Sequence, residues 1–134
     1  MEKRYRLRRG ILLFSLVTTV IIVAVADVFN STHLFNLSWP AHARFHIGMQ
    51  FTTLVLVSLA SFYGWKRHLN SLAALAPITF WPSLFAAYPI PGTSPYATPA
   101  LEAAGIPINL IIAGVWFALT LWGWMLTKET KTNF

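Results

Sequence analysis

Four long runs of apolar residues divide the chain, and most polar residues gather in the short segments between them. The runs cover 11–30, 41–65, 69–91 and 106–126. Each is long enough to cross the roughly 30 Å hydrocarbon core of a bilayer as a helix. The four runs take up most of the chain, so the pattern predicts one integral membrane domain over 1–134. Its fold class should be all-α, a four-helix transmembrane bundle.

The third run differs from the others in its prolines. Proline removes a backbone hydrogen-bond donor and bends a helix. The pattern therefore predicts a Pro-kinked third helix, whose bend can open a cavity, although the last two prolines also suit a plain helix end. The prolines are Pro77, Pro82, Pro89 and Pro91. The following loop, 92–105, is rich in turn-forming residues and is expected to form a cap or a short helix.

Composition agrees with a membrane protein. The 134 residues are 56% hydrophobic and 10% charged, which lies outside the usual range of a soluble domain. The chain has no cysteine, which excludes disulfides, thiolate metal ligands and cysteine nucleophiles.

The positive charges predict the orientation of the spans, because cytoplasmic flanks collect Lys and Arg. With the N-terminus inside, Arg44 alone falls on the outer side. The other nine cations fall on the cytoplasmic side: Lys3, Arg4, Arg6, Arg8, Arg9, Lys66, Arg67, Lys128 and Lys131. This distribution predicts a multi-pass protein with both termini cytoplasmic. The net charge of +6 then indicates contact with anionic lipid, and no nucleic-acid partner is expected.

The first run imitates a cleaved signal peptide. A basic start and an apolar stretch precede Ala24-Val25-Ala26, a pattern typical of a cleavage site. The apolar stretch is slightly long for that role, so we interpret it as a retained first span.

One segment, 27–50, holds three of the four histidines beside an acid and an arginine. On a helix, His42, His46 and Gln50 advance by only about 40° per step and share one face. Arg44 is about 200° from His42, so it is expected to contact lipid headgroups or Asp27.

Further polar groups fall at the outer end of the predicted bundle. Placing a polar group in a membrane costs free energy, so such groups tend to serve a function. We therefore expect acid/base catalysis on a lipophilic small molecule, for example by an isomerase, or binding without catalysis. The catalytic candidates are His46, as the main acid/base group, with His42, Asp27 and Glu102. The substrate-binding candidates are Gln50, His33, Arg44, Trp39, Tyr88 and Asn109. No cofactor is expected.

Two alternatives remain open. The histidines at i and i+4 could ligate a metal ion together with His33, Asp27 or Glu102, although no HExxH motif is present. Alternatively the polar groups are structural, with Asp27 and Arg44 forming an interfacial ion pair in an accessory subunit of a larger membrane complex. The expected partners are membrane lipid or a lipophilic small molecule, with further copies of the chain or other membrane subunits as the alternative.

The same segment also resembles the signature of a family of small four-span membrane proteins of unknown function. The resemblance covers about the first half of the chain and is most specific in a WPxHARFH core, whereas Leu37 stands where the family often has proline. It implies the fold and the importance of the segment but no chemistry. It is carried by Ala26-Asp27, Thr32-His33, Asn36, Trp39-Pro40 and His42-Ala43-Arg44-Phe45-His46.

In architecture and residue types the chain is also similar to the emopamil-binding and sigma-2 receptor bundles. That likeness implies a hydrophobic small-molecule substrate.

Overall fold

The computed structural model describes residues 2–128, and within this range the chain is helical without any strand. The all-α prediction is therefore confirmed. Helix α1 (Glu2–Val23) continues into a short π-helix, η1 (Ala24–Val28). The remaining helices are α2 (Ala41–Lys66), α3 (Asn70–Ala73), α4 (Leu75–Ala87), α5 (Pro99–Ala103) and α6 (Ile108–Lys128).

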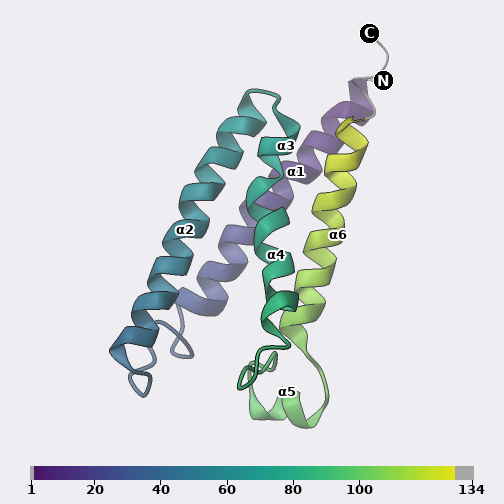
Figure 1. The fold of residues 1–134 in the computed structure, drawn as a ribbon. Coiled ribbons are helices and arrows are strands. Elements are labelled where there is room, and N and C mark those ends of the chain that lie inside the picture. The colour runs from purple at the N-terminus through teal and green to yellow at the C-terminus, as the bar shows by residue number, and fades with distance from the viewer. Residues whose placement is uncertain (1, 129–134) are drawn as a thin grey trace.

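Consecutive long helices, α1, α2, α4 and α6, run in opposite directions along the molecule (Figure 1). Helix α1 packs against α2 and α6, and α4 packs against α6 and α2. The start of α1 and the ends of α2 and α6 lie together at what we call the basic end. The loops 29–40 and 88–107 lie at the opposite end, the loop end (Figure 1).

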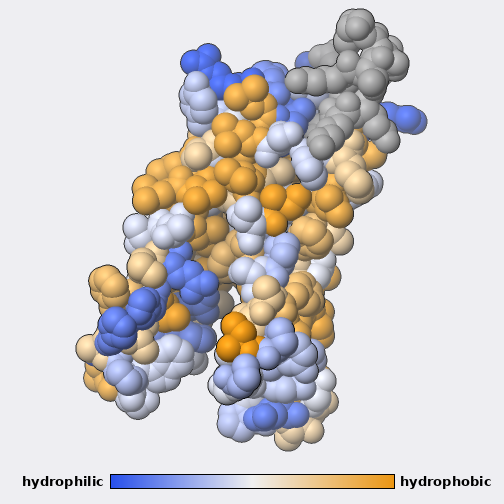
Figure 2. Space-filling model, viewed as in Figure 1, coloured by the Kyte–Doolittle hydropathy of each residue, from blue (hydrophilic) through white to orange (hydrophobic). Residues whose placement is uncertain are grey.

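Among the described residues, three helices are long and apolar enough to cross a membrane: Lys3–Val28, Ala41–Lys66 and Ile108–Leu126. These are consistent with the predicted membrane protein. In the space-filling view a hydrophobic band lies between two more hydrophilic ends (Figure 2). The third predicted span, 69–91, instead holds the short α3 and the 13-residue apolar α4.

The interruption between α3 and α4 follows from the sequence. Pro77 has no N–H to donate to the carbonyl of Ala73, and Pro82 lies inside α4. At the start of α4 the Ala76 N–H donates to Ser61 Oγ of α2 at 3.0 Å. A side chain of a neighbouring helix thus stabilises the beginning of α4.

Buried hydroxyls connect three helices in the interior. Ser15 of α1 and Thr120 of α6 share a hydrogen bond, and Thr19 Oγ1 donates to the Ser15 carbonyl at 2.7 Å. Trp81 of α4 donates its Nε1–H to Thr19 Oγ1 at 2.9 Å. Because buried polar groups need partners, this network fixes the position of Trp81 between α1 and α6.

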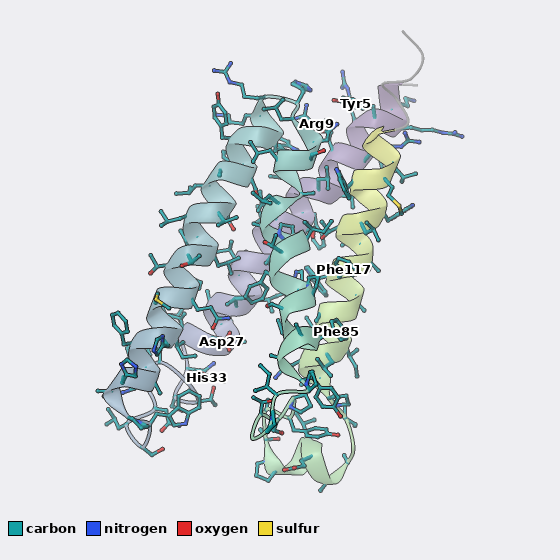
Figure 3. All side chains as sticks on the ribbon, in the orientation of Figure 1. Tyr5, Arg9, Asp27, His33, Phe85 and Phe117 are labelled. Carbon is teal, nitrogen blue, oxygen red and sulfur yellow. The ribbon has the colours of Figure 1, made fainter. Side chains whose placement is uncertain are left out.

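Arginines of α1 bind the ends of two other helices at the basic end. Arg8 Nη1 donates to the Leu126 carbonyl at 2.6 Å, and Arg9 donates to the Trp65 carbonyl and contacts His68. Figure 3 shows Arg9 at this end, far from Asp27. Lys66 and Arg67 at the end of α2 join this group, so the cations gather as the charge pattern indicated. Lys131 and the Lys128 side chain lie outside the described residues.

Candidate functional site

Helix α1 ends in a widened turn that contains Asp27. The Phe29 N–H donates to the Ala24 carbonyl at 2.7 Å, an i→i+5 bond that marks the π-helix. The Asn30 side-chain amide donates to the carbonyl of Val25 at 2.6 Å and to that of Ala26, so the freed helix-end acceptors are satisfied. Such π-turns are frequent at functional sites.

The loop after this turn folds back and brings His33 to Asp27. The Leu34 N–H donates to the Asp27 carbonyl at 3.2 Å, and His33 Nδ1 lies 3.6 Å from Asp27 Oδ1. The Trp39 ring packs edge-on against the His33 ring, with centroids 5.3 Å apart. The side chains of His33 and Asp27 remain 32% and 35% exposed, and Figure 3 shows both at the loop end.

A chain of hydrogen bonds assigns the protons of His33. The Asn30 amide nitrogen is directed at the helix-end carbonyls, so its Oδ1 is the acceptor for the Thr32 hydroxyl. Thr32 has one hydroxyl proton, and this proton goes to Asn30. The 2.8 Å contact between Thr32 Oγ1 and His33 Nδ1 therefore requires an N–H on Nδ1. In the neutral ring His33 Nε2 is then the basic nitrogen.

Asn36 fixes the second half of the loop. Its Oδ1 accepts from the Ser38 N–H at 3.0 Å and from Ser38 Oγ at 2.6 Å. Its Nδ2 donates to the Thr32 carbonyl at 3.2 Å. The asparagines of this loop therefore hold turns, and those turns position His33.

A cavity of about 450 Å³ lies beside Asp27 and His33, between η1, α2, α4, α6 and the loop before α5. A few polar groups converge in an otherwise apolar pocket, as is typical of small-molecule sites. The polar lining residues are Asp27, Asn30, Thr32, His33, Gln50, Thr98 and Asn109. The apolar lining is formed by Ile22, Val23, Ala26, Ile47, Phe80, Trp81, Leu84, Ala97 and Ile112.

Four of the residues predicted from the sequence thus meet in one cavity: Asp27, His33, Gln50 and Asn109. Gln50 also lines an adjoining groove of about 510 Å³ that contains His46. Tyr88 lies with Asn109 in a smaller hollow of about 130 Å³. Gln50 and Asn109 therefore connect the cavity to its neighbours.

The histidine pair of α2 lies outside this cavity. His42 and His46 are exposed and share one face, as helical spacing predicts, with their Nε2 atoms 3.0 Å apart. Neither contacts Asp27 or His33 in the described part of the chain. Within residues 2–128, no group of three or more His, Asp or Glu is arranged to hold a metal ion.

Three other predicted residues have different surroundings. Glu102 is exposed in α5 and does not line the cavity. Trp39 packs on His33. Arg44 lines a separate groove, and among the described residues it forms no ion pair with Asp27, whose ionic partner is His33.

Comparison of the chain with protein-family models, curated proteins and solved structures found no match. The likeness to the four-span family and to the emopamil-binding bundles therefore stays a prediction.

Several cavity residues were not predicted as site residues. Asn30 and Thr32 belong to an Asn-Ser-Thr turn, whose turn chemistry is a readable signal for a fixed loop. Phe80 and Trp81 carry no such signal, because an aromatic residue in an apolar run is ordinarily a packing residue.

Proposed function

We propose that this protein binds a lipophilic small molecule in the cavity at the loop end and acts on it by acid/base chemistry. The observation that carries the proposal is that Asp27 and His33 line one cavity together with Phe80 and Trp81. The cavity volume of about 450 Å³ is in the range of known ligand pockets, about 300–1,000 Å³. A sterol-like or isoprenoid molecule has the apolar body that such walls favour.

We further propose four membrane spans, with α3 and α4 together forming the third and with a proline bend between them. Two observations support this arrangement. Helices α3 and α4 follow one another along the bundle beside α2 (Figure 1), and the described cations other than Arg44 gather at the basic end. By the positive-inside rule, the basic end and both termini are cytoplasmic, and the cavity opens near the outer face.

In this proposal His33 is the proton-transfer group. Its Nδ1–H is held by Thr32 Oγ1 and faces the Asp27 carboxylate, which stabilises the imidazolium once Nε2 has taken a proton. An isomerisation needs a group that takes up and releases a proton reversibly. The proton removed at one atom is returned at another, and no cofactor is consumed. The amides of Gln50 and Asn109 can both donate and accept, so they suit a hydroxyl or carbonyl of the ligand.

Native mass spectrometry of the purified protein tests the binding part. Wild type and the control variant His42→Gln, which alters a histidine outside the cavity, should retain the same small molecule. Asp27→Asn should retain less of it. If wild type retains no molecule other than bulk lipid and instead co-purifies with other membrane proteins, the accessory-subunit alternative is favoured.

Solvent deuterium tests the chemistry without knowledge of the reaction. In D₂O, wild type should introduce deuterium into its extracted ligand, whereas His33→Gln should not. Thr32→Val removes the group that holds Nδ1–H, so deuterium incorporation per molecule of retained ligand should fall about tenfold or more. If wild type retains the ligand but introduces no deuterium, the acid/base role is refuted. The protein would then be a binding protein without catalysis.

A further inference from the structure

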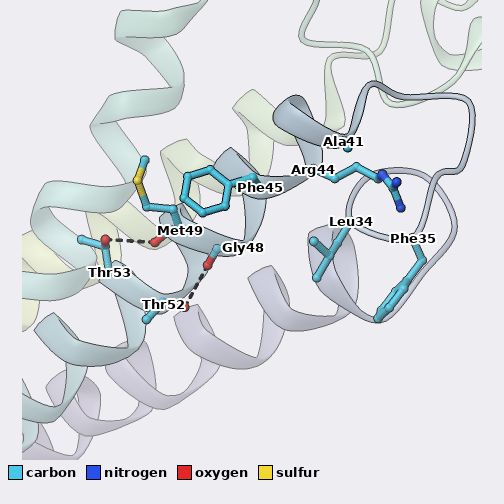
Figure 4. Close-up of a pocket in the computed structure, with 9 residues that line it drawn as sticks. All are labelled: Leu34, Phe35, Ala41, Arg44, Phe45, Gly48, Met49, Thr52 and Thr53. Carbon is cyan, nitrogen blue, oxygen red and sulfur yellow. Dashed lines mark hydrogen bonds between the residues drawn. The ribbon is translucent and has the colours of Figure 1, made fainter.

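A second groove lies on a different face of α2 and does not depend on the proposed small-molecule cavity. It has a volume of about 760 Å³ and runs between the loop residues Leu34 and Phe35 and the first three turns of α2. Figure 4 shows Arg44 at one end of it and Thr52 and Thr53 at the other. It shares no lining residue with the Asp27 cavity.

The charged end of the groove is Arg44. The other described Lys and Arg residues belong to the start of α1 or to the ends of α2 and α6, at the basic end. Arg44 Nε is shielded from solvent and has no hydrogen-bond partner. A buried donor without an acceptor is costly, and a guanidinium matches phosphate with two parallel hydrogen bonds. This end of the groove therefore suits an anion.

The rest of the groove is apolar in effect. Thr52 Oγ1 donates to the Gly48 carbonyl at 2.9 Å and Thr53 Oγ1 to the Met49 carbonyl at 3.0 Å, as the dashed lines in Figure 4 show. The hydroxyls are thus used within α2, and Phe45 and Met49 complete the surface. At Gly48 a Cβ would lie in van der Waals contact with Leu34 Cδ1, at 3.8 Å. The absence of a side chain there therefore keeps the groove open between α2 and the loop.

The length of the groove fits one leaflet of a bilayer. From Ala41 to Thr53 the helix axis rises about 18 Å at ~1.5 Å per residue. One leaflet supplies about half of the roughly 30 Å hydrocarbon core. A single anionic group followed by a chain of leaflet length describes a membrane phospholipid.

We infer that this groove binds an anionic phospholipid of the surrounding bilayer, with the phosphate on Arg44 and one acyl chain along Phe45, Met49 and Thr52. Charge complementarity selects an anionic headgroup over a zwitterionic one. The apolar lining distinguishes a lipid from free phosphate.

Native mass spectrometry of delipidated protein, titrated with dioleoyl phosphatidylglycerol or dioleoyl phosphatidylcholine, tests this inference. Wild type should bind phosphatidylglycerol more tightly. Arg44→Gln should weaken that binding about tenfold, the loss expected for a charged hydrogen bond, and should weaken phosphatidylcholine binding less, because the choline cation offsets the charge of that lipid's phosphate. Arg44→Lys should restore part of it.

Two further variants separate the groove from general electrostatics. Arg67→Gln removes an exposed cation at the basic end, which also attracts anionic lipid, so it measures the loss due to charge alone. Gly48→Leu fills the groove without changing charge and should weaken binding of both lipids. Thermal unfolding of each variant shows that it is folded.

Several results would overturn the inference. These are equal binding of the two lipids by wild type, a loss for Arg44→Gln no larger than for Arg67→Gln, and displacement of phosphatidylglycerol by inorganic phosphate. Loss of a protein dimer in Arg44→Gln, without loss of lipid, would assign the groove to a second copy of the chain instead.

Discussion

Two buried serines of α2, one helical turn apart, differ in their hydrogen bonding. Ser61 Oγ accepts from the Ala76 N–H at 3.0 Å, whereas Ser58 Oγ is buried without a hydrogen-bond partner. Ser61→Ala leaves the Ala76 N–H without an acceptor. We expect it to lower the free energy of unfolding by about 1–3 kcal/mol, measured by denaturant unfolding in detergent.

Ser58→Ala is the matched control. It removes a hydroxyl that makes no hydrogen bond, so the free energy of unfolding should be unchanged or slightly higher. Equal losses for both variants would show that the bond between Ser61 and Ala76 does not stabilise the start of α4.

The candidate site was predictable only in part, and particular residues show why. Regular helix geometry placed His42, His46 and Gln50 on one face, because spacing alone decides that. The pairing of His33 with Asp27 depends instead on a π-turn and on hydrogen bonds made by Asn30 and Asn36. No periodic pattern encodes such bonds, so the sequence favoured His46 over His33 as the main acid/base candidate.

At the scale of helices, the contact between α2 and α3 depends on the absence of a side chain. A Cβ on Gly64 would lie 2.7 Å from the Cβ and Cγ of Leu72. Gly64→Ala should therefore push α2 and α3 apart and destabilise the protein by about 1–3 kcal/mol. The measurement is thermal unfolding in detergent.

Gly10→Ala supplies the comparison. Gly10 lies in α1, and a Cβ at this position would have no other atom within 4 Å. Alanine there should be neutral or stabilise the helix by up to about 1 kcal/mol. If Gly64→Ala unfolds at the same temperature as Gly10→Ala, close packing at Gly64 is not required.

Helix starts were predictable where a proline or a capping residue marks them. Helix α2 begins at Ala41 as predicted, and the loop 92–105 contains the short α5, capped by Thr98 and begun by Pro99. Helix α1 begins at Glu2, well before the apolar run. An apolar run marks the part that fits the hydrocarbon core, and helices extend beyond it into polar residues.

At the scale of the whole molecule, the gathered cations predict the orientation in the membrane. The chain has no cysteine, so single cysteines report one position each. In intact cells, an impermeant maleimide should label Ser38→Cys at the loop end and should not label Arg67→Cys at the basic end. Permeabilised cells should label both, and wild type neither.

The reverse labelling pattern would place the basic end outside. Labelling of both variants in intact cells would indicate a mixture of orientations, in conflict with the positive-inside rule.

The arginines at the start of α1 would have two roles in the proposed topology, one during insertion and one in the folded protein. In the proposed topology, their charge alone orients the first span during insertion, and lysine would serve equally well. After folding, Arg8 and Arg9 bind backbone carbonyls near the ends of α6 and α2, for which the planar guanidinium fork matters. Helix α6 is the last of these helices to be synthesised. The hydrogen bond from Arg8 to the Leu126 carbonyl can therefore form only after the last of these helices has been made.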